Sequence, residues 1–167
     1  MESSPSPASA PLQTGQTVPD IPLETTGGPM RLSDLRGRLL VLYFYPKDNT
    51  PGCSNEAADF AEHWQAFRDA GAEVLGVSRD SLHSHQLFHQ KFDLPFVLVS
   101  DPDEILCTRF GVIRMKNMYG RQVRGIERST FLIGRDGVLL QAWRKVKVPG
   151  HTAAVLDAVR SAARPAS

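Results

Sequence analysis

Residues 39–45 form a continuous apolar and aromatic run, Leu-Leu-Val-Leu-Tyr-Phe-Tyr. The run does not alternate with polar residues, which is typical of a strand buried on both faces of a sheet. A strand of this kind needs a covering layer on each side. It therefore favours a layered α/β domain with this strand near the centre of the sheet.

Helix-like and strand-like stretches alternate after this run. Between residues 51 and 70 the apolar residues recur at steps of three and four, which predicts a helix with Pro51 in its first turn and Gly71 at its end. The other expected elements are strands over 72–77, 96–99, 119–126, 129–133 and 138–143, and helices over 81–92, 101–110 and 152–163. An Asp-Gly turn at 134–137 predicts an antiparallel hairpin. This order predicts a central mixed β-sheet flanked by helices.

Length and composition narrow the possible functions. The chain has 167 residues, which suits one domain over 15–164, preceded by a disordered tail over 1–14 that is rich in Ser, Pro and Ala. The formal net charge is +1 and no charged block stands out, so neither nucleic acid nor a membrane surface is an expected partner. No apolar run reaches the roughly 20 residues of a membrane-spanning helix, and no secretory signal is visible. Two cysteines suggest a reducing, cytoplasmic setting.

Cys53 lies where the buried strand gives way to the first helix. In a first helical turn the backbone N–H groups lack intrahelical partners, and the positive end of the helix dipole favours an anion such as a thiolate. An ordinary thiol is only a few per cent ionised at neutral pH. A helix N-terminus stabilises a nearby anion, here the thiolate, by at most about 2 kcal/mol. A nearby cation is therefore needed, and Arg128 is the candidate, at the start of the strand expected over 129–133.

The spacing Pro46-x-x-x-Thr50-x-x-Cys53 resembles the active-site signature of the peroxiredoxins, cysteine-dependent peroxidases with a thioredoxin-like fold. The longer run 45–53, Tyr-Pro-Lys-Asp-Asn-Thr-Pro-Gly-Cys, is similar to the Q-type subgroup, also called bacterioferritin comigratory proteins. The likeness continues through residues 77–81, 118–120, 125–131 and 145–151, and covers about 15 to 163. Taken singly, Cys53 could be an inert thiol, Thr50 a capping hydroxyl and Arg128 a surface cation. The ordered pattern that they form together favours a catalytic site.

The resemblance implies a role for each site residue. Cys53 would attack a peroxide oxygen as a thiolate and become a sulfenic acid. Thr50 would hydrogen-bond the thiolate and the peroxide, and Arg128 would stabilise the thiolate and the leaving oxygen. Pro46 would shield the sulfur from water, and the backbone N–H groups of Gly52 and Cys53 would donate to the peroxide. The implied activity is reduction of hydrogen peroxide or organic hydroperoxides, with no cofactor, because sulfur carries the redox chemistry.

The chain departs from the Q-type pattern in its second cysteine. Resolving cysteines of that subgroup occur at the positions of Ala58 or of residues 87–89, and this chain has His89 in the latter stretch. The remaining Cys107 lies beside apolar neighbours, which suggests a small core residue. We therefore predict a one-cysteine cycle, completed by an external thiol: thioredoxin, glutaredoxin or a low-molecular-weight thiol. Q-type relatives are commonly monomers, so a monomer is expected. A two-cysteine cycle that uses Cys107 is the alternative.

Three other classes are less favoured. A thioredoxin-type dithiol enzyme needs a Cys-x-x-Cys pair, which Cys53 does not have. A noncatalytic interaction module would have little reason to keep the whole motif. A metal site is conceivable from His83, His85 and His89 on one predicted helix, but no carboxylate or cysteine lies at a matching position, and a solvated face explains them equally well. No metal is expected.

Overall fold

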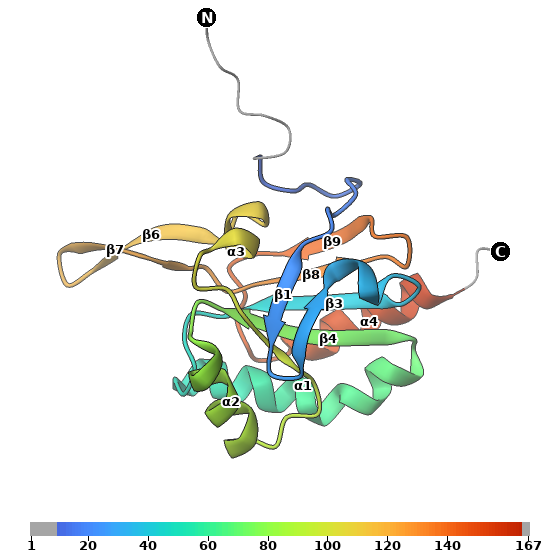
Figure 1. Cartoon of the computed structure of the whole chain (residues 1–167), viewed down its shortest axis with the longest axis horizontal. Coiled ribbons are helices and arrows are strands. Elements are labelled where there is room, and N and C mark those ends of the chain that lie inside the picture. The colour runs from blue at the N-terminus through green and yellow to red at the C-terminus, as the bar shows by residue number, and fades with distance from the viewer. Residues whose placement is uncertain (1–9, 165–167) are drawn as a thin grey trace, which may run out of the picture.

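The computed structural model describes residues 10–164, with the side chain of Met118 excepted. A seven-stranded sheet forms the centre, in the order β2-β1-β5-β4-β3-β8-β9, and β6 and β7 form a separate hairpin (Figure 1). The strands are β1 (Pro22–Thr25), β2 (Gly28–Arg31), β3 (Leu39–Phe44), β4 (Ala72–Ser78), β5 (Leu98–Ser100), β6 (Ile113–Met118), β7 (Arg121–Ile126), β8 (Ser129–Ile133) and β9 (Leu139–Trp143). The helices are a short 3-10 turn η1 (Leu32–Leu35), α1 (Pro51–Asp69), α2 (Leu82–Lys91), α3 (Ile105–Arg109) and α4 (His151–Ala163).

Strand β3 lies inside the sheet, as its composition predicts. It pairs in parallel with β4 and antiparallel with β8, and all of its residues are buried. Its side chains alternate between two clusters, with Leu39, Val41 and Tyr43 on one face of the sheet and Leu40, Leu42 and Phe44 on the other. The sheet is mixed, because β3, β4 and β5 run parallel while β1, β8 and β9 pair antiparallel with their neighbours. The predicted α/β fold with a mixed central sheet is confirmed.

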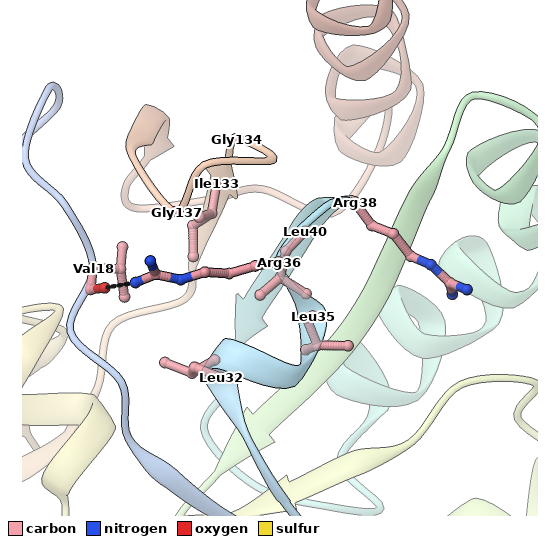
Figure 2. Close-up of a pocket in the computed structure, with 9 residues that line it drawn as sticks. All are labelled: Val18, Leu32, Leu35, Arg36, Arg38, Leu40, Ile133, Gly134 and Gly137. Carbon is pink, nitrogen blue, oxygen red and sulfur yellow. Dashed lines mark hydrogen bonds between the residues drawn. The ribbon is translucent and has the colours of Figure 1, made fainter.

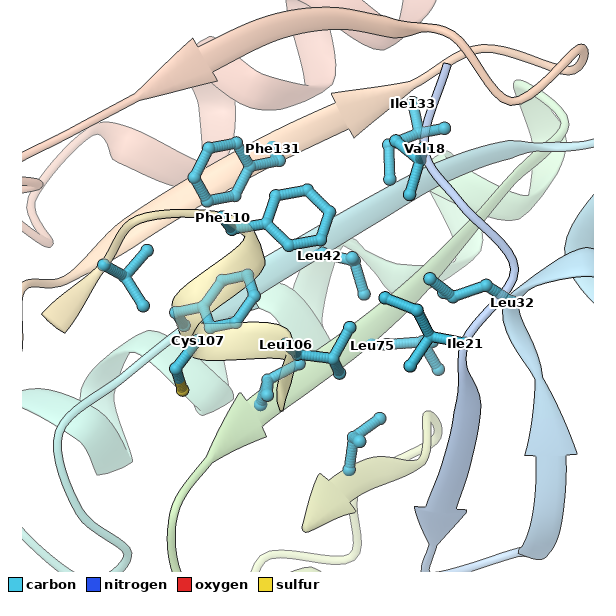
Figure 3. Packing of buried hydrophobic residues seen from close by; sticks show 14 of the residues in the cluster. Val18, Ile21, Leu32, Leu42, Leu75, Leu106, Cys107, Phe110, Phe131 and Ile133 are labelled. Atoms are coloured by element: carbon cyan, nitrogen blue, oxygen red, sulfur yellow. The ribbon is translucent and has the colours of Figure 1, made fainter. Parts of the chain in front are cut away.

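Different elements cover the two faces of the sheet. The face that carries Tyr43 packs against α1, α2 and α4, through residues such as Phe60, Phe88 and Val155. The other face packs against α3, η1 and the N-terminal segment, as Figure 3 shows for Cys107, Phe110, Ile21 and Leu32. The sheet therefore separates two hydrophobic cores.

The folded region begins earlier than expected. Residues 1–9 of the predicted tail lie outside the described residues, but Leu12 is buried and its N–H donates to the Arg109 carbonyl at 2.9 Å. A single leucine in a Ser- and Pro-rich stretch gives little hydrophobic signal, although burying it against α3 contributes roughly 1.5–3 kcal/mol. The disordered-tail prediction is therefore wrong for residues 10–14.

Three strands were not anticipated. Strands β1 and β2 are short and half exposed, so the sequence shows no apolar run there. Strand β6 carries Arg114, Lys116 and Asn117, and it projects with β7 away from the body of the protein (Figure 1). Such a ribbon has no buried face along most of its length. The alternation of apolar and polar residues that marks a half-buried strand is therefore absent. Along residues 10–164, no helix has the length and apolar character needed to cross a bilayer.

Candidate active site

The site is built at the end of β3, where the chain turns into α1. Thr50 is the N-cap residue in an extended conformation, Pro51 occupies the first helical turn, and Cys53 follows two residues later. The first helical hydrogen bond runs from the Ser54 N–H to the Thr50 carbonyl at 2.8 Å. The N–H groups of Gly52 and Cys53 thus have no intrahelical acceptor, and they lie at the positive end of the helix dipole.

Arg128 reaches this helix end from the neighbouring strand. The pairing of Phe44 with Ser129 brings residue 128, just before β8, to the end of β3. The Arg128 Nη2 lies 3.3 Å from the Cys53 Sγ, and its Nη1 donates to the Glu56 Oε1 at 2.6 Å. One guanidinium therefore contacts both the sulfur and a carboxylate one helical turn further along α1.

Gly52 leaves room for this approach. A Cβ at Gly52 would lie 3.2 Å from the Arg128 Nη2, closer than side chains normally pack. The φ angle of Gly52 is not positive, so the conformation itself does not demand glycine. The requirement at this position is the space for the guanidinium.

Glu56 gives the site an unusual electrostatic character. Its side chain is 1% exposed, and burial raises its pKa from 4.5 to about 7, although Arg128 acts in the opposite direction. For Arg128, burial lowers the pKa, but the charges of Glu56 and Cys53 outweigh it, so the pKa lies above its ordinary value. The guanidinium stays charged and is shared between two groups that can each carry a negative charge.

Thr50 makes a different hydrogen bond from the one expected, and Pro46 lies at a pocket next to the site. The Thr50 hydroxyl donates to the Lys47 carbonyl at 2.8 Å, and so is not used toward Cys53 in this conformation. Pro46 and Arg128 line an open pocket of about 610 Å³ next to the base of the β6–β7 hairpin. Cys53 itself is 1% exposed and packs with the core on the α1 side of the sheet. The structure thus places Pro46 and Arg128 at the pocket wall, and the buried sulfur contacts Arg128.

A second polar group joins the loop before α1 to α2 and to the residues just before α2. Asp48, Asp80 and His85 bring ligand atoms within 4.8 Å of one another, the one such group of potential metal ligands among the described residues. His85 is fully buried, so the interpretation of the helix histidines as a solvated face is wrong for this residue. Its ring faces Asp48 at 2.7 Å and the Val99 carbonyl at 2.8 Å, so the donor atoms are already paired within the protein.

Cys107 lies on the other side of the sheet. It packs in α3 within the cluster drawn in Figure 3, whereas Cys53 belongs to the cluster on the opposite face. Burial and the nearby charge of Asp101 raise the pKa of the Cys107 thiol far above its ordinary range. Cys107 is therefore a neutral, fully covered thiol.

The pocket in Figure 2 is a poor candidate for a second site. It lies at the opposite end of β3 from Cys53, between η1 and the β8–β9 turn, where Arg36 donates to the Val18 carbonyl at 3.3 Å. Its accessible space is about 20 Å³, which is enough for about one water molecule.

Comparison with known proteins agrees with this geometry. The model of the AhpC/TSA family matches residues 14–142. The chain is 55% identical over 146 residues to peroxiredoxin Bcp of Xanthomonas campestris, covering 87% of this chain and 91% of that protein. It is 44% identical over 150 residues to peroxiredoxin Bcp of Bacillus subtilis, covering 89% and 96%. The chain is a peroxiredoxin.

Solved structures place this peroxiredoxin in the Q-type subgroup. The bacterioferritin comigratory protein of Xanthomonas campestris, studied for alkyl peroxide reduction, superimposes with a TM-score of 0.83 at 54% identity, covering 86% of this chain and 92% of that one. A cysteine-to-serine variant of PrxQ from Xylella fastidiosa superimposes with a TM-score of 0.87 at 48% identity, covering 92% and 98%. The protein is accordingly a thiol-dependent peroxidase with a thioredoxin-like fold.

Sequence reasoning missed the buried polar partners of this peroxiredoxin. Glu56 follows Cys53 by three residues and precedes Phe60 by four, so helical spacing alone puts it on the buried face of α1. His85 precedes Phe88 by three residues and shares the buried face of α2 in the same way. Charged residues on an apolar helix face were the available signal.

Proposed function

We propose that Cys53 is the peroxide-reactive thiol of this peroxidase and that it works in a one-cysteine cycle. The observation that carries the proposal is the 3.3 Å contact between the Arg128 guanidinium and the Cys53 sulfur, at the N-terminus of α1. A fixed cation and a helix dipole both stabilise a thiolate over a thiol. Preorganised donors of this kind also stabilise charge that develops on the leaving oxygen.

The chemistry balances in two stages. The Cys53 thiolate attacks one peroxide oxygen; an S–O bond forms, the O–O bond breaks, and the leaving oxygen takes a proton to depart as water or an alcohol. This leaves a sulfenic acid, with sulfur oxidised by two electrons. One external thiol then displaces water to form a mixed disulfide, and a second external thiol releases the Cys53 thiolate and a disulfide product.

The one-cysteine form of the cycle is supported by the position of Cys107. The two thiols pack into cores on opposite faces of the central sheet. A disulfide requires Cα atoms within about 7 Å, so this pair could form only if α1 or α3 rearranged from its own face of the sheet. The two-cysteine alternative with Cys107 is therefore less favoured.

Thr50, Pro46 and the Gly52 backbone complete the proposed site. In the peroxide complex the Thr50 hydroxyl would turn from the Lys47 carbonyl, 2.8 Å away, toward the substrate. Pro46 would cover the sulfur from the pocket side, and the N–H groups at the start of α1 would donate to the peroxide. The choice among thioredoxin, glutaredoxin and small thiols stays a prediction, as do the monomeric state and a cytoplasmic location.

Turnover of hydrogen peroxide with dithiothreitol as reductant tests the proposal. Wild-type protein and Cys107→Ser should consume peroxide at rates within about twofold of each other, since Cys107 is outside the proposed chemistry. Cys53→Ser should lose turnover entirely. Full turnover by Cys53→Ser, or its loss in a folded Cys107→Ser protein, would contradict the proposal.

A further inference from the structure

An open pocket of about 610 Å³ adjoins Arg128, the residue that contacts the Cys53 sulfur. Pro46 and Arg128 form part of its wall, and side chains from β6, from residue 127 and from the loop at 145–146 form the rest. The Val146 N–H donates to the Arg128 carbonyl at 3.0 Å, so this loop is fastened directly to the proposed active site. A molecule in the pocket would therefore lie next to the guanidinium.

The charged residues of this pocket are predominantly basic. They are one carboxylate and four cations: Glu127, Arg114, Lys116, Arg128 and Lys145. Glu127 is neutralised by Arg114, whose Nε lies 3.1 Å from the Glu127 Oε2. Arg128 is engaged with Glu56 and with the sulfur. The two lysines therefore give the pocket its net positive charge.

Neither lysine is neutralised by the protein itself. Within residues 10–164, no carboxylate lies within ion-pair distance of Lys116 or Lys145. The Lys116 Nζ donates to the Ile126 carbonyl at 3.4 Å, which leaves its charge uncompensated. Lys145 is exposed, in a left-handed conformation with φ of 51° that is uncommon for a residue with a Cβ. Both ammonium groups are thus available to an anion that enters the pocket.

The size and the apolar lining of the pocket suit a small organic molecule. Its volume lies within the roughly 300–1,000 Å³ that is usual for small-molecule sites. Hydrogen peroxide, about the size of two water molecules of roughly 30 Å³ each, would fill little of it. Met115, which is 58% exposed, and Val146 add apolar surface beside the lysines. The pocket therefore fits a small anion that also has a carbon chain.

The proposed one-cysteine cycle requires space for such a molecule. The external thiol attacks the Cys53 sulfenic acid as a thiolate: an S–S bond forms, the S–O bond breaks, and the departing hydroxide takes the proton that the thiol lost and leaves as water. The rest of this thiol stays bonded to Cys53 until a second thiol releases it as a disulfide. The pocket provides room for it beside Arg128.

We propose that this pocket selects the reductant of the peroxidase, a low-molecular-weight thiol that carries a carboxylate. Lys116 and Lys145 bind the carboxylate, and the carbon chain lies against Met115 and Val146. The proposal rests on the one-cysteine function proposed for Cys53. It decides among the expected reductants by charge and size, because a protein such as thioredoxin is too large to enter the pocket.

Reduction of the oxidised protein by two matched thiols tests the proposal. One equivalent of hydrogen peroxide first converts Cys53 to the sulfenic acid, and glutathione or its diethyl ester, in which both carboxylates are masked, is then added. Intact mass of acid-quenched samples gives the rate of sulfenic acid loss, compared per thiolate. We expect glutathione to react about tenfold faster than the ester at low salt. This ratio should fall toward one in about 1 M sodium chloride, where the screening length is about 3 Å.

Lys145→Gln should lower the ratio of the two rates about threefold. Lys147→Gln is the control, because it removes the same charge from an exposed residue of the same loop that does not line the pocket, and its ratio should equal that of wild type. A disturbance that slows both thiols equally leaves the ratio unchanged. A wild-type ratio near one, or an equal fall in both variants, would overturn the selection by the pocket and leave the peroxidase function standing. A wild-type Cys53 that resists peroxide would instead contradict the proposed function.

Discussion

At the scale of single residues, the proposed site has one cation in contact with two groups that can each carry a negative charge. Arg128 contacts the Cys53 sulfur and Glu56 through different nitrogens of its guanidinium. Glu56 competes with the thiolate for this cation when ionised and ceases to compete when protonated. Because burial places the pKa of Glu56 at about 7, this competition changes within the physiological range.

Arg128→Lys should slow Cys53 oxidation strongly. An ammonium group keeps the charge but cannot span the sulfur and Glu56 as the forked guanidinium does. We expect a loss of about 100-fold in the second-order rate with hydrogen peroxide, the size typical of a lost transition-state donor. Stopped-flow oxidation measures it, and Arg124→Lys on the exposed hairpin is the control. An unchanged rate in Arg128→Lys would remove Arg128 from the mechanism.

Glu56→Gln should change how stability depends on pH. The folded protein holds a proton on Glu56 between pH 4.5 and about 7, and the unfolded chain releases it there. The contribution of Glu56 to stability is therefore present below pH 4.5 and declines as the pH rises to about 7, by about 3 kcal/mol in all.

The measurement is the free energy of unfolding by urea from pH 4.5 to 7.5. Relative to wild type, Glu56→Gln should become more stable by this amount as the pH rises. Glu62→Gln, an exposed position on the same helix, should show no such trend. Parallel curves for wild type and Glu56→Gln would mean that Glu56 keeps an ordinary pKa.

At the scale of elements, the active site depends on two connections that end at the same edge of the sheet. The β3–α1 turn supplies Cys53, and the start of β8 supplies Arg128. Each element is regular, so the sulfur and the guanidinium are set by strand register and helix capping rather than by a long loop. A change in either connection should alter reactivity without unfolding the protein.

Gly52→Ala should separate reactivity from stability. Alanine is a better helix former than glycine by about 1 kcal/mol, and the backbone conformation accepts it. Its Cβ would lie 3.2 Å from the Arg128 Nη2 and would push the guanidinium from the sulfur. We expect oxidation to slow by about fivefold to tenfold, with a melting temperature equal to or above that of wild type. A slower protein that is also less stable would point to a general disturbance of α1.

Prediction of these elements from sequence succeeded where burial shows as periodicity. Strand β3 and helix α1 are almost wholly specified by their apolar patterns, and Cys53 and Arg128 were placed by their positions at the element ends. The same reasoning did not predict β1, β2 and β6, because these strands bury few side chains and so show no apolar pattern. The Arg128–Glu56 and Asp48–His85 pairs join residues far apart in the chain, so only the fold shows them as partners.

At the scale of the whole molecule, the central sheet separates the two cysteines. Cys53 lies in the core beneath α1, α2 and α4, and Cys107 lies in the core beneath α3 (Figure 3). In the proposed one-cysteine cycle, this division leaves the oxidised Cys53 without an internal partner thiol. We therefore expect an external thiol to complete the cycle and excess peroxide to drive Cys53 on to the sulfinic acid.

The most direct test is a single turnover of the fully reduced protein with one equivalent of hydrogen peroxide, read by intact mass and by a sulfenic-acid trap. We expect rapid gain of one oxygen, a trapped label on Cys53, and a Cys107 thiol that still reacts after unfolding. Loss of both thiols together, with the mass of an intramolecular disulfide, would contradict it.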